Sequence, residues 1–230
     1  MQSFKPLFVA AAFILSLTAL PASGGELVVT GEATVETVPD MAIITLGVET
    51  QARTAAAALD DNSRSMSELL AVLKAANVEG RDTQTRGLML DAQYTRQTNS
   101  SPSQISGYVA RNQVQVRVRN LDDLGTILDA AVRAGGNQFY GLQFDVQDKA
   151  PLNDQALADA VRAARHKAGI MAEAAGVSLG PVVDIRQSGT SRAPSPMVRE
   201  MAMAMDAVPI AEGSVGITAS VTVVYEIAEP

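Results

Sequence analysis

The chain contains no cysteine, no tryptophan and a single histidine, His166. The lack of cysteine excludes disulfides, thiolate nucleophiles, thiolate zinc sites and a lipid-modified N-terminal cysteine. Histidine is the side chain whose ordinary pKa lies near neutrality, so common acid–base chemistry would have to use His166. Because so few catalytic groups are present, we expect a protein that is not an enzyme, has no catalytic residue and is stabilised by packing alone.

His166 lies within residues 152–175, where the pattern predicts a helix that Gly176 ends. The apolar stripe of this helix contains Leu157, Val161, Ala164, Ala168 and Met171. His166 follows Leu157 by nine positions, which places it on about the opposite side of a helix that turns 100° per residue. We therefore expect an exposed histidine without the buried partner that a catalytic base needs.

Long apolar runs are also scarce, and the one present is at the N-terminus. Residues 7–20 follow Lys5 and precede the small residues Ala22, Ser23 and Gly24. This run is too short to span a bilayer and has the pattern of a signal peptide. We expect cleavage of residues 1–24, Sec-type export and no later membrane span.

Positively charged residues are fewer than negatively charged ones. The chain has 18 Lys and Arg and 25 Asp and Glu, which gives a net charge of -7. An acidic surface repels phosphate backbones, and no run of basic residues is interleaved with aromatic ones, so we expect no nucleic-acid partner. The chain also has neither an alternating-carboxylate calcium loop nor a glycine-rich phosphate loop. We therefore expect no cofactor and no metal site of these kinds.

What the chain does contain is an alternation of strand and helix patterns. Apolar alternation predicts strands at 26–30, 41–50, 83–95, 107–119, 138–147, 181–187 and 215–227. Helical spacing predicts helices at 53–76, from Asn120 to the Gly135-Gly136 pair, and at 152–175. From Met41 onward the order is β-α-β-β-α-β, as in ferredoxin-like folds. We predict one α+β domain over 25–230, with this unit extended by an N-terminal strand and by a C-terminal helix plus two strands.

Three finer expectations follow from the same patterns. The first two strands are separated only by the turn at 38–40, so we expect them to pair as a hairpin. In the strand at 107–119 the valines should point inward and Gln113, Gln115, Arg117 and Arg119 outward. The last strand is long enough for a central or rim-spanning position, while residues 188–212 have no period and predict a flexible Met/Pro-rich loop.

Three methionines in that loop, Met201, Met203 and Met205, would present their thioethers on one side if the backbone were extended. Such a segment can pack adaptably against its own core or a neighbouring subunit. It can also bind Cu(I) through soft sulfur ligands, or be oxidised reversibly to sulfoxide and so consume oxidants. The sequence leaves these alternatives open, and we assign no metal site beyond naming these residues as candidates.

Several short motifs occur in a fixed order along the chain. They are Val29-Thr30-Gly31-Glu32, Pro39-Asp40-Met41-Ala42, Leu46-Gly47-Val48-Glu49-Thr50, Gly107-Tyr108 with Asn112, Val116-Arg117-Val118-Arg119, Leu128-Asp129-Ala130-Ala131 and Val221-Thr222-Val223-Val224-Tyr225. In this order the chain resembles the SIMPL-domain family over about residues 26–228, and is most similar to its periplasmic immunogenic and oxidative-stress defence members.

This resemblance implies an α+β domain and a periplasmic or outer-membrane-associated location in a Gram-negative cell. It also implies, from some members, assembly into large ring-like or channel-like homo-oligomers and a loose link to oxidative stress. The family offers no established catalytic residues to carry over.

Three hypotheses about function remain after these steps. The first is a non-enzymatic periplasmic homo-oligomer that assembles through exposed sheet edges or the 188–212 loop, because unpaired strand edges offer free backbone groups to another subunit. The second is a methionine-based copper binder or oxidant scavenger. The third is an unrecognised hydrolase or small-ligand module, since a fold does not determine a function.

Overall fold

The computed structural model describes residues 25–95, 103–193 and 211–229. The predicted signal peptide at 1–24 and the candidate ligands Met201, Met203 and Met205 lie outside the described residues.

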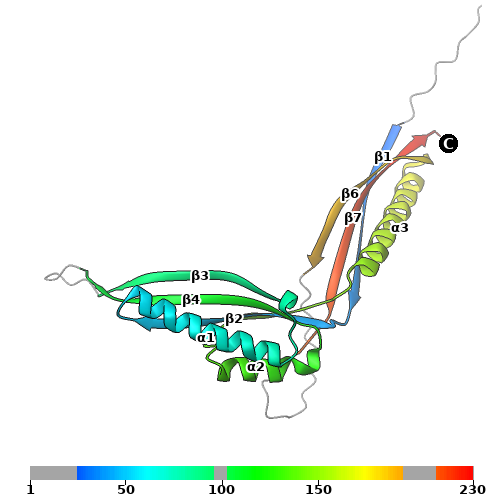
Figure 1. Cartoon of the computed structure of the whole chain (residues 1–230). Coiled ribbons are helices and arrows are strands. Elements are labelled where there is room, and N and C mark those ends of the chain that lie inside the picture. Colours follow the sequence, from blue (N-terminus) through cyan, green and yellow to red (C-terminus); the bar gives the residue numbers. More distant parts are fainter. Residues whose placement is uncertain (1–24, 96–102, 194–210, 230) are drawn as a thin grey trace, which may run out of the picture.

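The described chain forms two separate antiparallel sheets with helices packed against them (Figure 1). In chain order the elements are β1 (Gly25–Thr37), β2 (Met41–Ala52), α1 (Ala55–Ala75), η1 (Gly80–Asp82), β3 (Thr83–Tyr94), β4 (Ile105–Val118), η2 (Leu121–Asp123), α2 (Leu124–Arg133), β5 (Gln138–Asp145), α3 (Ala150–Ala175), β6 (Ser178–Ala193) and β7 (Val215–Ala228). One sheet has the strand order β3-β4-β2-β5 and the other β1-β7-β6. The predicted α+β class is confirmed.

The four-stranded sheet with α1 and α2 is the ferredoxin-like unit that the sequence predicts, and we call it the ferredoxin-like layer. In this sheet β3 and β4 form a hairpin. Strand β4 also pairs with β2, and β5 pairs with the other edge of β2. Val114, Val116 and Val118 of β4 point inward as expected, and they lie in one core with Leu69 of α1 and Ile127 of α2. Alternation of apolar and polar residues therefore sets which face of the sheet the helices cover.

Helix α1 is fastened to this sheet by an asparagine as well as by its apolar stripe. Asn62 is fully buried, and its Nδ2 donates to the carbonyl oxygens of Val48 and Ala110 at 2.9 and 3.0 Å. Helical spacing in the sequence predicts that Leu59, Met66, Leu69, Leu70 and Leu73 share this stripe, but Leu70 is exposed while Leu69 is buried. The stripe is therefore narrower than the sequence indicates, because a polar residue occupies part of it.

The remaining elements, β1, α3, β6 and β7, form what we call the terminal layer. Strand β7 lies between β1 and β6, which confirms its predicted central position. Helix α3 packs on this sheet through a row of buried alanines with a four-residue spacing. They are Ala156, Ala160, Ala164, Ala168 and Ala172. This differs from the predicted stripe at Met171, which is exposed, while Leu157 and Val161 flank the row. Alanines rather than larger apolar residues form the contact, because their small side chains let the helix approach the sheet closely.

The expected hairpin of the first two strands is wrong. Strand β1 pairs with β7 along its whole length, and β2 lies in the other sheet between β4 and β5. The connection at 38–40 therefore carries the chain from one layer to the other. Neighbourhood in sequence misleads here because β1 has its own apolar alternation, and Val29 buries against α3 rather than against α1 or α2.

Two predicted boundaries also need correction. Strand β1 continues to Thr37 rather than ending near residue 30. Strand β6 extends to Ala193, so residues 188–193 are strand rather than the start of an irregular loop. Its backbone continues to pair with β7 after shifts of register, for example Arg192 with Ile217. The pairing partner β7 imposes a strand on residues whose own sequence shows no clear alternation.

The two layers meet at an angle near the ends of β1, β2 and β7 (Figure 1). Each layer has its own hydrophobic core, and the two clusters of buried residues have no member in common. The described helices include none that is both long and apolar enough to cross a membrane.

Candidate functional site

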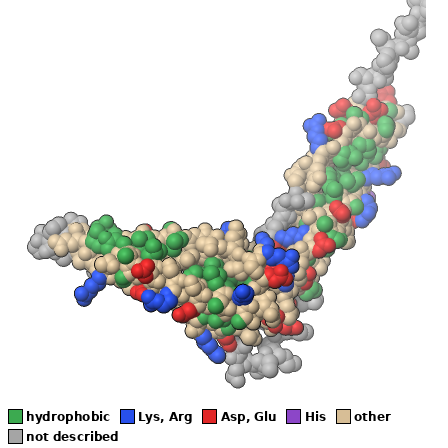
Figure 2. All heavy atoms as spheres, viewed as in Figure 1, with side chains coloured by type: hydrophobic (Ala, Val, Ile, Leu, Met, Phe, Trp, Pro, Cys, Tyr) green, Lys and Arg blue, Asp and Glu red, His purple; other side chains and the backbone are tan. Residues whose placement is uncertain are grey.

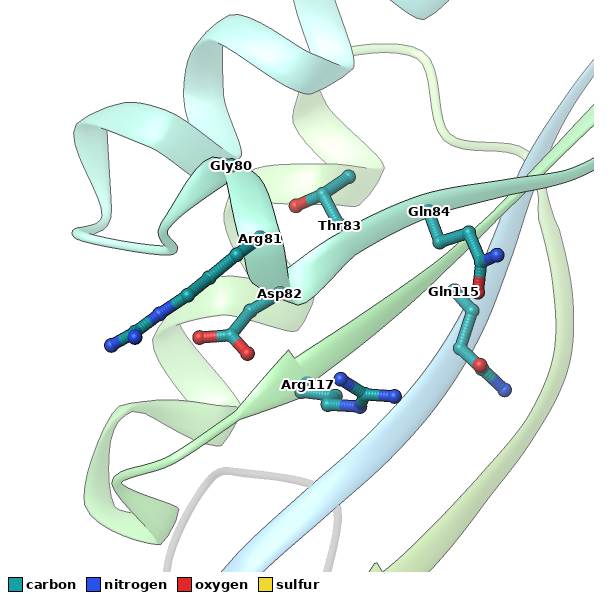
Figure 3. A pocket seen from close by; sticks show the side chains of 7 residues that line it. All are labelled: Gly80, Arg81, Asp82, Thr83, Gln84, Gln115 and Arg117. Atoms are coloured by element: carbon teal, nitrogen blue, oxygen red, sulfur yellow. The ribbon is translucent and has the colours of Figure 1, made fainter.

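A polar cleft of about 380 Å³ lies where η1 leads into β3, close to the junction of the two layers. Strand β4 continues here beyond the strand that pairs with it, since Val116 pairs with Thr83 but Arg117 has a partner only in β2. The turn of η1 and the end of β4 that extends beyond β3 enclose the space. Its lining residues are Gly80, Arg81, Asp82, Thr83, Gln84, Gln115 and Arg117 (Figure 3).

The carboxylate in this cleft, Asp82, is held by a two-pronged ion pair with Arg119. The Nε and Nη2 atoms of Arg119 donate to the two oxygens of Asp82 at 2.6 and 2.7 Å. The Asp82 side chain is only 2% exposed, whereas that of Arg119 is 41% exposed. The Arg119 hydrogen bond lowers the pKa of Asp82 despite the opposing effect of burial, with smaller electrostatic contributions from Arg119, Arg81 and Arg117. Asp82 is therefore a fixed anion and not a proton acceptor.

Two further arginines line the cleft, and they differ in their partners. Arg81 forms an exposed ion pair with Glu79, with Nε and Oε2 2.8 Å apart. Arg117 is exposed and has no ion pair within the part of the chain that the structure describes. Figure 3 shows Arg81 extending away from Arg117, and the Arg117 guanidinium lying between Asp82 and Gln115. The cleft therefore contains one guanidinium that forms no direct ion pair with a described carboxylate, although its charge contributes to the lowered pKa of Asp82.

Arg119 also connects the cleft to a network at the junction of the layers. Its Nη1 donates to Oε1 of Gln147 at 3.3 Å, and Nε2 of Gln147 donates to the carbonyl oxygens of Arg119 and Asp40 at 3.1 and 3.2 Å. The backbone nitrogen of Gln147 donates to Oδ1 of Asp40 at 2.8 Å. Asp40 precedes β2 and Gln147 precedes α3, so one glutamine links both connections between the layers.

A second polar cluster lies further along the same sheet face, at Arg111. Its Nε is 2.7 Å from Oε2 of Glu49 and its Nη1 is 2.9 Å from Oδ2 of Asp91. The hydrogen bond to Glu49, followed by its negative charge, raises the pKa of Arg111. Because two carboxylates surround this guanidinium, the cluster has no surplus positive charge to offer a ligand.

The residues that the sequence singles out do not gather in the cleft. His166 lies on the exposed side of α3, as predicted, in the other layer. Within the described residues, no group of three or more His, Asp or Glu could hold a metal ion. The methionine proposal lies outside the described residues, so it stays a prediction.

The cleft was not predicted from the sequence, although the direction of two of its lining residues was. The alternation at 107–119 correctly points Gln115 and Arg117 away from the core. It cannot show that β3 begins opposite Val116, which is what leaves the end of β4 open. Asp82 itself has no pattern that distinguishes it from an ordinary turn residue.

These observations define a class: a two-layer α+β protein built on a ferredoxin-like unit, with a polar cleft beside its interlayer junction. Comparison with known proteins gives the family. The chain belongs to the SIMPL family, described as "Protein of unknown function (DUF541)", whose model matches residues 27–225. The resemblance inferred from the motifs is thereby confirmed.

Individual relatives are similar over most of their length. The chain is 35% identical to the 26 kDa periplasmic immunogenic protein of Brucella melitensis, covering 98% of this chain and 95% of that protein. It is 33% identical to the uncharacterized protein YggE of Edwardsiella ictaluri, covering 80% and 77%. It is 30% identical to YggE of Escherichia coli K12, covering 91% and 85%.

Proposed function

We propose that this protein is a non-enzymatic periplasmic protein that acts as a homo-oligomeric assembly, with a loose role in envelope or oxidative-stress defence. Its periplasmic location is supported by the apolar run at 7–20 and by the name of the Brucella relative. Peripheral association with the outer membrane belongs to the same proposal.

The observation that carries the assembly proposal is the edge strand β3. Three consecutive residues, Leu88, Met89 and Leu90, are 55%, 53% and 42% exposed. Consecutive strand residues point to opposite faces, so this edge is apolar on both sides. One edge of β3 pairs with β4, and the other has no partner strand among the residues that the structure describes. Free backbone groups flanked by apolar side chains favour the addition of a strand from another subunit.

The apolar surface continues to the distal end of the ferredoxin-like layer. Tyr94 and Ile105 pair across β3 and β4, and both are exposed. Figure 2 shows hydrophobic side chains gathered over this end of the molecule. Since scattered exposed apolar residues are ordinary but contiguous ones mark interaction sites, this patch supports a protein partner.

A second apolar edge lies on the terminal layer, at β6. Val182, Val183 and Ile185 are each about half exposed, at 46%, 52% and 54%. Among the described strands β6 pairs only with β7, so within that part of the chain its outer edge is also unpaired. Two different edges on one subunit allow head-to-tail contacts, which close into rings when the rotation between subunits permits. A second copy of this chain is therefore the partner we propose for both edges.

Light scattering of the purified protein across concentration and salt tests this proposal. We expect one large species of defined mass, and a smaller mass for the Leu88→Lys/Leu90→Lys variant and for Val183→Lys, because a lysine on an edge strand opposes pairing. Ala71→Lys, on the exposed side of α1, is the matched control and should keep the wild-type mass. A monomeric wild-type protein, or equal masses for all four proteins, would reject assembly through these edges.

The alternative function, a methionine-based copper binder or oxidant scavenger, rests on Met201, Met203 and Met205. These residues lie outside the described part of the chain, so the alternative stays a sequence-based prediction.

A further inference from the structure

Arg117 differs from two neighbouring outward-pointing arginines, Arg111 and Arg119, in having no direct ion pair with a described carboxylate. Arg111 contacts Glu49 and Asp91, and Arg119 contacts both oxygens of Asp82. Arg117 lies between them in sequence and has no carboxylate partner within the described residues. The nearby carboxylate of Asp82 is already engaged by Arg119, and the guanidinium of Arg117 remains open to the cleft (Figure 3). A planar guanidinium with free donors matches the geometry of carboxylate and phosphate groups.

Two glutamines complete a polar wall beside Arg117. Gln84 of β3 and Gln115 of β4 are direct partners across the ladder, and their side chains lie near each other at one end of the cleft (Figure 3). Neither side chain has a hydrogen bond to another described residue. Each amide can donate two N–H bonds, so the pair can contact oxygens of a ligand that Arg117 holds.

Charge and size limit the class of ligand. The whole chain is acidic, with a net charge of -7, while the cleft combines two ion pairs, Arg81 with Glu79 and Arg119 with Asp82, with the positive charge of Arg117. A concave positive region concentrates small anions. A volume of about 380 Å³ is within the range of small-molecule sites. The lining contains no aliphatic or aromatic side chain, so the ligand should be hydrophilic.

We propose that this cleft binds a small, multiply charged oxyanion of the carboxylate or phosphate class, held by Arg117, Gln84 and Gln115. Arg81, at the opposite rim, is paired with Glu79 and does not contact the same group. Asp82 and Arg119 are positioning residues, because their ion pair fixes η1 against the end of β4 and keeps Asp82 from neutralising Arg117. The site does not depend on the assembly state or on the methionine segment.

Equilibrium dialysis of the purified protein against radiolabelled citrate and, separately, inorganic phosphate tests the proposal. We expect saturable binding of at least one of them, near one per chain, that persists at about 0.15 M salt, where unspecific surface attraction is largely screened. Arg117→Gln should weaken this binding about tenfold or more, because it removes a charged two-pronged donor. Gln115→Glu should weaken it similarly by placing a negative charge beside the ligand.

The matched control is Arg53→Gln, which removes an exposed arginine at the opposite end of β2 and should leave binding unchanged. Thermal unfolding of each variant verifies the fold, and Arg117→Lys, which keeps the charge but not the fork, should bind with intermediate affinity. The proposal is overturned if the wild-type protein binds neither anion saturably, or if Arg53→Gln lowers binding as much as Arg117→Gln. It is also overturned if Arg117→Gln changes only the mass of the assembly, since a carboxylate of a neighbouring copy would then occupy the cleft.

Discussion

Arg119 is the residue on which the cleft and the interlayer junction both depend. Its guanidinium holds the buried carboxylate of Asp82 and also contacts Gln147. Replacing Arg119 by Gln leaves Asp82 buried with no cation directly on it. Because an uncompensated buried charge is costly, we expect the variant to lose about 2–3 kcal/mol of unfolding free energy at neutral pH, measured by urea denaturation.

The same ion pair predicts how this loss varies with pH. In the wild-type protein the pKa of Asp82 is lowered by Arg119, so its contribution is present above the unfolded-state pKa of about 4 and is lost as pH falls through the folded-state value. The stability gap between the wild-type protein and Arg119→Gln should therefore narrow below about pH 4. Arg81→Gln breaks an exposed pair and serves as the control, with little effect expected. A gap that stays constant down to acid pH would contradict this role of Asp82.

The exposure of a single residue can be predicted from the sequence when it depends only on residues nearby in the chain. The exposure of His166 follows from helical period alone, and the outward direction of Arg117 follows from strand alternation. The burial of Asp82 and Asn62 follows from neither. Asp82 is buried because Arg119 covers it from the end of another strand, and Asn62 because two strand carbonyls accept its amide hydrogens. Such partners are distant in sequence, so no local pattern reveals them.

At the scale of elements, the contact between α3 and β1 depends on one glycine. A Cβ on Gly31 would overlap the Ala160 carbonyl oxygen and the Ala164 backbone nitrogen. Backbone atoms cannot move aside as a side chain end can, so Gly31→Ala should force α3 away from the sheet. We expect a loss of about 3 kcal/mol or more in unfolding free energy, at or above the upper end of ordinary overpacking, measured by chemical denaturation.

A second glycine offers the matched control for this contact. Gly169 lies on α3 itself, and a Cβ there would meet nothing within 4 Å. Because alanine favours a helix more than glycine does, Gly169→Ala should gain roughly 0.5–1 kcal/mol. If both glycine variants changed stability by similar amounts in the same direction, close packing of α3 on β1 would not be what Gly31 provides.

The elements themselves were predictable from the sequence, and so were the strand partners within the ferredoxin-like layer, but not the partner of β1. Period and capping residues identify the helices and the central stretch of each strand, and the β-α-β-β-α-β order correctly predicts the strand order of the ferredoxin-like layer. The pairing of β1 with β7 joins the two ends of the described chain and was missed. The sequence feature that could have indicated this pairing is the row of alanines on α3 together with Gly31 of β1. Both allow the helix to approach the sheet of β1 and β7 closely.

At the scale of the whole molecule, Gln147 is the residue most able to couple the two layers. The buried clusters of the layers share no residue, so cooperative unfolding depends on the chain connections, on the polar contacts between them and on buried residues that belong to neither cluster, such as Met41, Val146 and Val215. The Gln147 side chain makes three of these contacts, to Asp40 and Arg119. Gln147→Ala removes all three, and since each is exposed we expect a net cost of only about 1 kcal/mol.

The informative effect of Gln147→Ala is therefore on coupling rather than on total stability. Hydrogen exchange under increasing denaturant should show the amides of β7 and those of β4 opening with closely similar free energies in the wild-type protein and with separate ones in the variant. Gln143→Ala is the control, because this exposed glutamine of β5 has no side-chain hydrogen bond to another described residue. Identical exchange for the two variants would mean that the Gln147 side chain does not couple the layers. Separation in Gln147→Ala would instead mean that this side chain couples the opening of the two layers.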